Sequence, residues 1–286
     1  MHTRQLLLCT DMDRTIIPNG TESEHPDARK RFKAFCLHPE VTLAYVTGRH
    51  KKLVQQAIKN YHLPRPDYAI TDVGTKIYKI EGEEWEELTE WKQEISQSWN
   101  GYDHQQIKNL LNDIEDLILQ ERNKQNTHKL SYYLPLFIDS DTVIKKMSHL
   151  LKQQNIDASI LWSIDELKNI GLLDVLPANA TKLHAIEFLQ QKLGFQHKET
   201  VFAGDSGNDL PVLISPVQSI LVDNASDEIK TSAQQLAQQN GNEATLYISK
   251  PLICGMNANY SAGVLEGILH FTPQFHSLLA IEKASA

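Results

Sequence analysis

The chain has 286 residues, of which 41% are hydrophobic and 22% charged, a composition typical of a globular protein with a sizeable core. Its formal net charge of -8 at pH 7 argues against a nucleic-acid partner, because non-specific binding to nucleic acid requires a basic face. No segment approaches the roughly 20 apolar residues that a membrane helix requires, so we expect a soluble, cytoplasmic protein without a membrane partner.

Cysteine and histidine are not arranged as metal ligands. Cys9, Cys36 and Cys254 lie far apart and form no Cys-x-x-Cys pair. This spacing is typical of buried apolar thiols in a reducing compartment and disfavours a disulfide framework or a zinc site. The 12 histidines form no His-Glu-x-x-His pattern, so we interpret them as surface or packing residues.

The first part of the chain alternates short apolar runs with amphipathic segments. Strands are predicted over 6–9, 41–46 and 68–71, and helices between them over 26–35 and 51–59. This βαβαβ order indicates a parallel sheet with right-handed crossovers and helices on both faces.

The composition changes after residue 80. Seven glutamates lie between Glu81 and Glu94, and all four tryptophans lie between residues 85 and 162. We interpret the glutamates as a solvated face and the tryptophans as the core of an inserted α+β module, with a sugar-lining tryptophan as the alternative. The elements predicted inside it are, in order, a helix over 102–119, a strand over 129–134, a helix over 141–153 and a strand over 158–162.

Strands and helices alternate again from residue 171 onward. The predicted strands cover 172–176, 200–203, 219–222 and 245–248, and the helices cover 181–192, 208–214, 226–239 and a segment starting near 261. The chain is therefore predicted to be an α/β protein. Its core would be a Rossmann-like, doubly wound parallel sheet formed by residues 1–80 and 171–286, with the smaller module inserted over 81–170.

Two acidic clusters follow predicted core strands. Asp11 and Asp13 come after the first strand, and Asp205, Asn208 and Asp209 come after the strand over 200–203. Because the carboxyl ends of parallel strands meet at one edge of a sheet, we expect the two clusters to form one divalent-metal site. Oxygen ligands without a histidine or cysteine cluster favour Mg²⁺.

Thr47, at the end of the second strand, and Lys182, at the start of a helix, are expected at the same edge. A nucleophile, an acid, a bridging cation and donors for phosphoryl oxygens are what metal-assisted phosphoryl transfer requires. Each residue also has a simpler explanation. Asp11, Asp205 or Thr47 could cap a helix, Lys182 could be a solvated lysine, and Asp209 could only brace its loop.

Four segments together resemble the motifs of a known superfamily. In order they are Asp11-Met12-Asp13-Arg14-Thr15, Thr47-Gly48-Arg49, Lys182 and Gly204-Asp205-Ser206-Gly207-Asn208-Asp209, and they resemble the motifs of haloacid dehalogenase (HAD) superfamily phosphatases. The inserted module is similar in position and size to the class II (C2B-type) cap of that superfamily. The segments over 70–78, 129–133 and 259–267 look most like sucrose-phosphate phosphatases.

The resemblance implies a Mg²⁺-dependent phosphatase for a small sugar phosphate, with sucrose 6-phosphate or a related disaccharide phosphate as the expected substrate. Asp11 would attack phosphorus to form an aspartyl phosphate, and Asp13 would protonate the leaving sugar oxygen and then take a proton from water. Thr47 and Lys182 would hold the transferring phosphoryl oxygens, assisted by backbone amides near Gly48.

The resemblance also implies a ligand set for Mg²⁺. The ion would be held by the carboxylates of Asp11 and Asp205, by the carbonyl of Asp13, and, directly or through water, by Asn208 or Asp209. The module is expected to close over the site, with hinges near 80–82 and 169–171.

Arg49, Lys129 and Ser131 are further candidates for substrate binding, with an exposed surface arginine as the alternative for Arg49. Arg14 stands where the superfamily frequently has Gly or Asn, and we expect it to tighten the entrance or meet an anionic substrate. A sugar phosphomutase of the same superfamily and a non-catalytic sugar-phosphate-binding protein are the other functions that these motifs permit. The sequence leaves the oligomeric state open.

Overall fold

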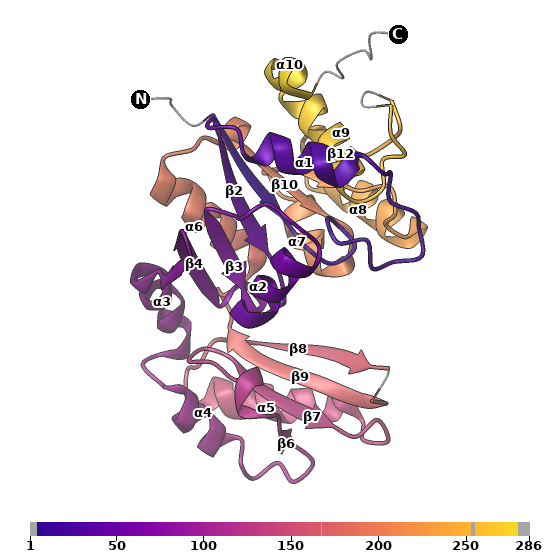
Figure 1. Cartoon of the computed structure of the whole chain (residues 1–286). Helices are drawn as coiled ribbons and strands as arrows, with labels where there is room; N and C mark the ends of the chain where they lie inside the picture. Colours follow the sequence, from indigo (N-terminus) through magenta and orange to yellow (C-terminus); the bar gives the residue numbers. More distant parts are fainter. Residues whose placement is uncertain (1–4, 167, 253–254, 280–286) are drawn as a thin grey trace.

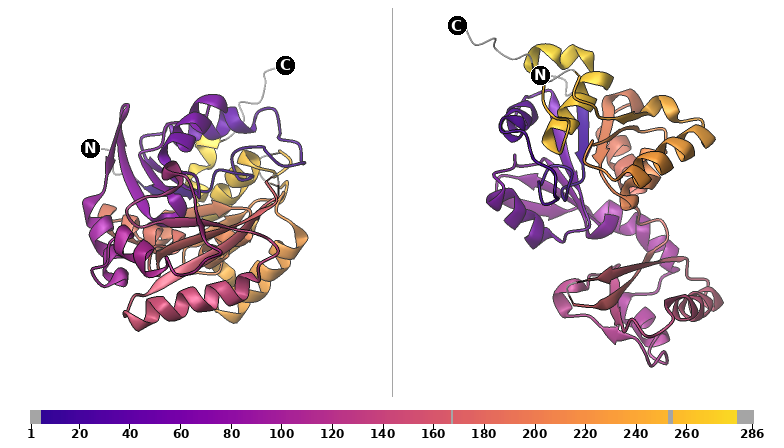
Figure 2. Two further views of the ribbon diagram at one scale, coloured as in Figure 1. Left: turned by 90° about the horizontal axis from the view of Figure 1, so that it is seen from below. Right: turned by 90° about the vertical axis from the view of Figure 1, so that its right-hand side faces the viewer.

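The computed structural model describes residues 5–166, 168–252 and 255–279. These residues form two parts, each built on its own sheet (Figure 1). The larger sheet has eight strands in the order β12-β11-β10-β1-β2-β3-β4-β5, and the smaller has four in the order β6-β7-β9-β8. The side view in Figure 2 shows the smaller part against one end of the larger.

The larger sheet is parallel except at one edge. Its parallel strands are β1 (Leu6–Thr10), β2 (Val41–Val46), β3 (Tyr68–Thr71), β10 (Thr200–Gly204), β11 (Gln218–Leu221) and β12 (Leu246–Ile248). A hairpin of β4 (Lys76–Glu81) and β5 (Glu84–Glu87), which the sequence pattern did not predict, adds two antiparallel strands beside β3. The predicted α/β core with a mainly parallel sheet is confirmed.

Helices cover both faces of this sheet. One face packs under α1 (Ala28–Cys36), α2 (Lys51–Asn60) and α9 (Ser261–Phe271), followed by the short α10 (His276–Leu279). The other packs under α3 (Thr89–Ser96), α6 (Lys182–Leu193), α7 (Leu210–Leu213) and α8 (Asp227–Gln239). Leu6 and Leu8 enter the first layer, and Leu7 and Cys9 enter the second, so β1 is fully buried between them.

The smaller module has one covered sheet face. Its antiparallel strands are β6 (Ile118–Leu119), β7 (Leu130–Leu134), β8 (Ala158–Asp165) and β9 (Ile170–Pro177). The helices α4 (His104–Leu110) and α5 (Ser140–Gln153) pack on alternate strand residues such as Leu130, Tyr132 and Val175. Because side chains alternate along a strand, Ser131 and Asp174 point from the opposite face.

The sheet pairing differs from the expected division of the chain at residues 80/81 and 170/171. Strand β9, predicted as a core strand, pairs with β7 and β8 in the smaller sheet, while β4, β5 and α3 extend the larger part. The chain therefore crosses between the parts after Ile95 and again after Pro177. The segments predicted as hinges do not coincide with these two crossings. Residue 82 is in the β4–β5 turn, and residues 169–171 are in the β8–β9 hairpin.

Three local predictions also need correction or restriction. The predicted helix over 102–119 ends at Leu110, because the following Asn112 and Asp113 favour turns through local hydrogen bonds. Of the tryptophans predicted in the module core, Trp91 is buried in the larger part instead, where its Nε1 donates to Gly74 O at 2.9 Å. Trp85 also packs there, whereas Trp99 and Trp162 belong to the module core; the glutamate run is largely exposed, as predicted.

The cysteine and membrane predictions can be compared only with the described residues. Cys9 and Cys36 are buried and free, as expected, and Cys254 lies outside the described residues. None of the helices in the described part of the chain combines the length and the apolar character needed to cross a membrane.

Candidate active site

The predicted site residues meet where three strands of the larger sheet end. Asp11 follows β1, Thr47 follows β2, Asp205 follows β10, and Lys182 begins α6. They line a pocket of about 370 Å³, together with Asp13, Arg14, Gly48, Arg49, Leu53, Val73, Ser206 and Asn208. The structure thus brings the two acidic clusters together, as the parallel-sheet argument predicts.

Three buried carboxylates lie close enough to share a cation. One oxygen from each of Asp11, Asp205 and Asp209 lies within 4.8 Å of the other two. The Lys182 Nζ lies 2.7 Å from Asp209 Oδ1 and 3.4 Å from Asp11 Oδ2. Lys182 contacts two of the three buried acids, and only the half-exposed Arg14 contacts the third, so the donor set fits an additional divalent cation bound through oxygen.

The pKa values of the carboxyl groups reflect this excess of negative charge. Burial raises the pKa of Asp11 to about 7, with repulsion from Asp209 adding to the effect and Lys182 opposing it. Burial and the charge of Asp209 raise the pKa of Asp205 to about 6. The Lys182 ammonium gains from the same charges, which raise its pKa against the effect of burial. A cation at this place would favour the ionised carboxylates.

Asp209 is held from both of its oxygens. Its Oδ1 accepts from Lys182, and its Oδ2 accepts from the amides of Asp205 and Ser206 and from Ser206 Oγ, each at 3.1 Å. Gly204 makes room for it, because a Cβ at that position would lie 2.6 Å from the Asp209 carboxyl carbon. This geometry favours the interpretation in which Asp209 braces the loop and orients Lys182. Asn208 is exposed at the pocket.

Arg49 binds the second aspartate of the first motif. Its Nε and Nη2 donate to Asp13 Oδ2 and Oδ1 at 2.7 and 2.5 Å, and Asn19 Nδ2 donates to Oδ1 at 2.8 Å. Partial burial alone would raise the pKa of Asp13, but these hydrogen bonds and the guanidinium charge lower it. Arg49 therefore lines the pocket as a partly buried, paired side chain, and its role in substrate binding stays a prediction.

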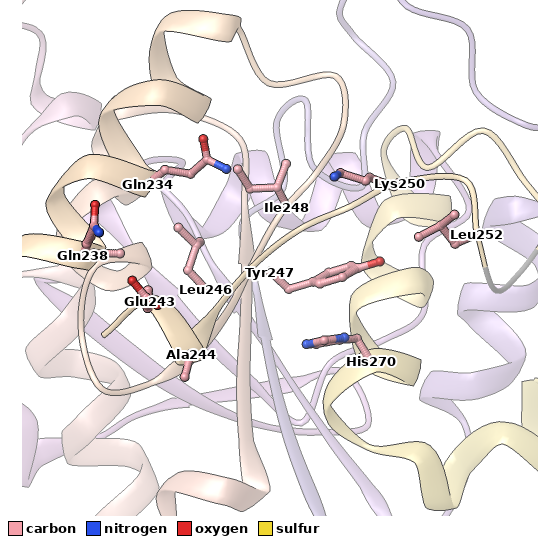
Figure 3. A pocket seen from close by; sticks show the side chains of 11 residues that line it. Gln234, Gln238, Glu243, Ala244, Leu246, Tyr247, Ile248, Lys250, Leu252 and His270 are labelled. Atoms are coloured by element: carbon pink, nitrogen blue, oxygen red, sulfur yellow. The ribbon is translucent and has the colours of Figure 1, made fainter. Parts of the chain in front are cut away.

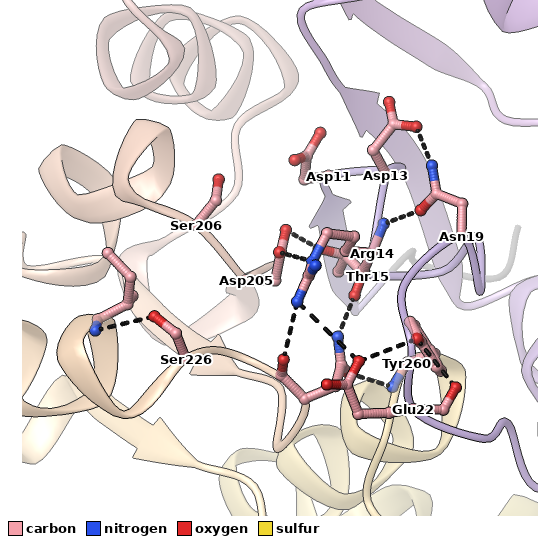
Figure 4. Close-up of polar contacts among 12 residues, drawn as sticks. Asp11, Asp13, Arg14, Thr15, Asn19, Glu22, Asp205, Ser206, Ser226 and Tyr260 are labelled. Carbon is pink, nitrogen blue, oxygen red and sulfur yellow. Dashed lines mark hydrogen bonds and ion pairs between the residues drawn. The ribbon is translucent and has the colours of Figure 1, made fainter. Parts of the chain in front are cut away.

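Arg14 and Thr15 both contact Asp205 (Figure 4). The buried Thr15 Oγ1 donates to Asp205 Oδ1 at 3.2 Å, and Arg14 Nε donates to Oδ2 at 3.3 Å. Sequence reasoning singled out Arg14 as unusual but did not find this partner, and it gave Thr15 no role. The only feature of the sequence that could have pointed to these contacts is the position of both residues in the first motif.

A strained turn after β3 fixes the loop that carries Thr47. Asp72 and Val73 have φ angles of 51° and 61°, a left-handed conformation that is costly for a β-branched residue such as valine. The amide of Val73 donates to Thr47 O at 3.3 Å, and that of Asp72 donates to Arg49 O at 3.0 Å. Gly74 lies against Thr181, where a Cβ would come within 2.7 Å of backbone. The turn therefore joins the Thr47 loop to the start of α6.

A family model described as sucrose-6F-phosphate phosphohydrolase matches residues 4–272, which include every one of these motifs. The chain belongs to this family. A HAD-like hydrolase of Nitrosococcus oceani is 48% identical over 272 residues, covering 95% of this chain and 73% of that protein. The mannosylfructose-phosphate phosphatase of Agrobacterium fabrum is 30% identical, covering 80% of this chain and 87% of its own.

The crystal structure of the Synechocystis sucrose-phosphatase in complex with sucrose and phosphate has the same fold. Its TM-score is 0.70 at 27% identity, covering 94% of this chain and 98% of that chain. The predicted membership of the HAD superfamily, the α/β fold and the phosphatase activity are thereby confirmed, and the protein is a phosphoric monoester hydrolase. The chain spans 60% of the length of an Arabidopsis thaliana probable sucrose-phosphatase that it also matches.

Lys129 and Ser131, both predicted to bind substrate, lie in the smaller module and do not line the pocket of about 370 Å³. Lys129 Nζ is 3.1 Å from Asp174 Oδ2, and the Ser131 hydroxyl donates to the other oxygen of Asp174. The module touches the larger part nearby, where Asn126 Nδ2 donates to Thr75 Oγ1 at 3.0 Å. Lys129 and Ser131 thus form a polar group with Asp174 on the sheet face opposite α4 and α5, where Ser131 is fully buried.

A second pocket of the phosphatase, of about 560 Å³, lies beside the edge strand β12 (Figure 3). Its walls come from α8, β12, the segment after β12 and α9, and it includes Tyr247 stacked on His270 with ring centroids 4.2 Å apart. The acidic cluster is not part of its lining. This pocket is therefore separate from the candidate active site.

Proposed function

We propose that this phosphatase hydrolyses a small sugar phosphate with the help of Mg²⁺, and that sucrose 6-phosphate or a related disaccharide phosphate is its substrate. The observation that carries the proposal is the convergence of Asp11, Asp205 and Asp209 with Lys182 at the ends of parallel strands. The names of two relatives, a sucrose-phosphatase and a mannosylfructose-phosphate phosphatase, support a disaccharide phosphate.

Asp11 is the proposed nucleophile. It is buried, and its backbone amide donates to Ala203 O at 2.8 Å, which ties the nucleophile to the neighbouring strand β10. An attacking carboxylate must be ionised, and the nearby Lys182 favours that form. The acyl phosphate divides the hydrolysis into attack by Asp11 and attack by water. Thr47 and Lys182, with the amides near Gly48, would hold the transferring phosphoryl oxygens.

The Mg²⁺ would be held by the carboxylates of Asp11 and Asp205 and by the carbonyl of Asp13, with Asn208 available at the pocket and Asp209 bracing the loop. Once bound, Mg²⁺ supplies positive charge that stabilises the developing charge on the phosphoryl oxygens. The raised pKa values of Asp11 and Asp205 in the metal-free protein support this assignment.

Asp13 is the proposed acid and base. Arg49 binds both of its carboxylate oxygens. A substrate phosphate is a competing anion for the same guanidinium, since arginine binds phosphate and carboxylate through equivalent paired hydrogen bonds. Transfer of Arg49 to the phosphate would leave Asp13 free to protonate the leaving sugar oxygen.

The smaller module is the proposed cap that selects the sugar. Lys129 and Asp174 offer a cation and a carboxylate on the sheet face opposite α4 and α5, and the buried Ser131 hydroxyl holds Asp174 in place. Such a group matches the hydroxyls of a disaccharide better than an apolar surface would. Closure of the module would bring this face toward the pocket and limit the entry of water.

A phosphate-release screen with Mg²⁺ tests the proposal. It compares sucrose 6-phosphate, mannosylfructose phosphate, trehalose 6-phosphate and hexose monophosphates, with Asp11→Asn as the inactive control. Preferred release of phosphate from a disaccharide phosphate is the expected result. Isomerised sugar phosphate without free phosphate would favour a mutase, and binding without turnover would favour a non-catalytic binding protein.

A further inference from the structure

We propose that Arg14 is an exchangeable counter-ion of Asp205: its guanidinium occupies that carboxylate in the metal-free protein and leaves when a divalent cation binds. The proposal rests on the metal site of the proposed function. It concerns a residue that belongs to the first motif by position but is not one of the proposed catalytic groups. Figure 4 shows the guanidinium between Asp205 and Glu22.

The first step is the distribution of positive charge over the cluster. Lys182 contacts Asp209 and Asp11, and its side chain is only 7% exposed. Arg14 forms an ion pair with Asp205 at 3.3 Å, and its side chain is 43% exposed. Lys182 is therefore enclosed by the cluster. Arg14 is already in contact with solvent, so its guanidinium can leave Asp205 without any change in the fold.

The second step is the difference between the two oxygens of Asp205. Oδ1 accepts from Thr15, which is fully buried and cannot leave. Oδ2 accepts from Arg14 through a single contact of 3.3 Å, whereas Arg49 binds Asp13 through two contacts of 2.7 and 2.5 Å. Oδ2 is thus the oxygen that an incoming cation can take at the smallest loss.

The third step is the place to which the guanidinium can move. Its Nη2 already lies 4.0 Å from Glu22 Oε2 and donates to Asn224 O at 3.3 Å. A small rotation of the side chain toward Glu22 would replace the lost contact with Asp205 by a solvent-exposed ion pair. The arginine therefore has an acceptor on either side of its present position.

Arg14 can be changed without disturbing the loop. Its φ of 55° suits asparagine, which adopts the left-handed region readily. The backbone is held independently of the side chain, because Arg14 N donates to Asn19 Oδ1 at 2.8 Å and Asn224 Nδ2 donates to Arg14 O at 2.6 Å. Arg14→Asn thus removes the guanidinium and keeps the turn.

The experiment measures Mg²⁺ binding by calorimetry and thermal unfolding in EDTA and in Mg²⁺, on the full chain. Without a competing guanidinium, Arg14→Asn should bind Mg²⁺ about fivefold more tightly or better. Its midpoint of unfolding should fall in EDTA, because Asp205 has lost its counter-ion, and should rise further than that of the wild type when Mg²⁺ is added.

Two variants act as matched controls. Arg65→Asn changes the net charge equally, but Arg65 pairs with the exposed Glu83 at the β4–β5 hairpin, so its Mg²⁺ affinity should equal that of the wild type. Glu22→Gln removes the acceptor for the displaced guanidinium and should weaken Mg²⁺ binding. An equal gain in affinity for Arg65→Asn and Arg14→Asn would overturn the exchange in favour of a general charge effect.

Other outcomes separate the exchange of Arg14 from the proposed Mg²⁺ site on which it rests. Unchanged or weaker Mg²⁺ binding by Arg14→Asn would overturn the exchange and make Arg14 a residue that merely positions Asp205, while the metal site stands. If the wild type bound no Mg²⁺, or Asp205→Asn bound it normally, the metal site itself would be wrong. Should Arg14→Asn fail to fold, Arg14→Gly, which also tolerates this φ, provides the same measurement.

Discussion

The two parts of the molecule each pair a lysine with a carboxylate, but only one of them leaves negative charge unbalanced. In the larger part, Asp11, Asp205 and Asp209 lie close together, but the enclosed Lys182 contacts only Asp11 and Asp209, and the half-exposed Arg14 contacts Asp205. In the smaller module, the partly buried Lys129 pairs with the carboxylate of Asp174, whose other oxygen accepts from a serine hydroxyl. An unbalanced acidic cluster indicates a cation site, whereas a balanced pair is suited to structure or to a neutral sugar.

This difference in charge balance helps to distinguish residues that take part in catalysis from residues that recognise the sugar. Excess charge in the larger part raises the pKa values of Asp11 and Asp205 and makes the metal-free site electrostatically unfavourable. The protein tolerates this because a bound divalent cation would supply the missing positive charge. The module has no comparable excess at Asp174, so its polar group can stay folded without a ligand.

The largest effect should come from removing the proposed nucleophile. Asp11→Asn should lower phosphate release by about 10³-fold or more, because no acyl phosphate can form. The same change removes one of three crowded charges, so the midpoint of unfolding in EDTA should rise relative to the wild type. Activity close to that of the wild type would contradict the role of Asp11, and lower stability in EDTA would contradict the argument from unbalanced charge.

Replacing Lys182 and Lys129 in turn tests whether the two parts differ in charge balance, because the two changes should then cost different amounts of stability. Lys182→Met leaves buried carboxylates without their cation and should lower the free energy of unfolding by about 3–5 kcal/mol, with partial recovery in Mg²⁺. Lys129→Met removes one partner of a partly exposed pair and should cost about 1 kcal/mol or less. Urea unfolding with and without Mg²⁺ measures both, and equal losses would remove the distinction between the two parts.

The position of the site could be predicted from the sequence because it follows from topology. Asp11, Thr47 and Asp205 each come directly after an apolar run, and parallel pairing brings the ends of β1, β2 and β10 to one edge. The same reasoning placed Lys182 correctly at the start of a helix. The position of a residue directly after a parallel strand is enough to place it at this edge, because the backbone of the strand fixes the position of its Cα.

The partners of long side chains could not be predicted in this way. Arg14 and Arg49 each have several carboxylates within reach, and the choice of Asp205 and Asp13 depends on the three-dimensional packing of loops. The sheet to which β9 belongs was missed for a related reason. Its apolar pattern predicts a strand, but a pattern does not say which neighbours the strand will have.

A smaller effect should separate recognition from chemistry in the module. If Asp174 contacts the sugar, Asp174→Asn should raise KM for the preferred sugar phosphate by about 5–20-fold and change kcat by less than about twofold. Hydrolysis of p-nitrophenyl phosphate, which has no sugar, should stay the same. A parallel loss with both substrates would show that the change disturbs the fold or the pocket and not the choice of sugar.

The two parts should also differ in a pH dependence of stability, which has opposite signs in them and partly cancels in the wild type. Burial lowers the pKa of His128 in the module from 6.5 to about 4, so the unfolded chain binds more protons between these values, and stability falls as the pH drops through them. Burial raises the pKa of Asp11 from 3.8 to about 7, so the folded metal-free protein holds the extra proton, and stability rises over the corresponding fall in pH. His128→Phe keeps an aromatic ring beside Trp99, which meets the His128 ring at 5.4 Å between centroids.

Unfolding midpoints in EDTA between about pH 7.5 and 5 measure both contributions. Relative to the wild type, His128→Phe should lose less stability on acidification, because the ring that binds a proton in the unfolded chain is gone. Asp11→Asn should lose more, because the carboxyl that binds a proton in the folded protein is gone. Since the two variants remove linkages of opposite sign, shifts in the same direction would show that these groups do not control the pH response of their respective parts.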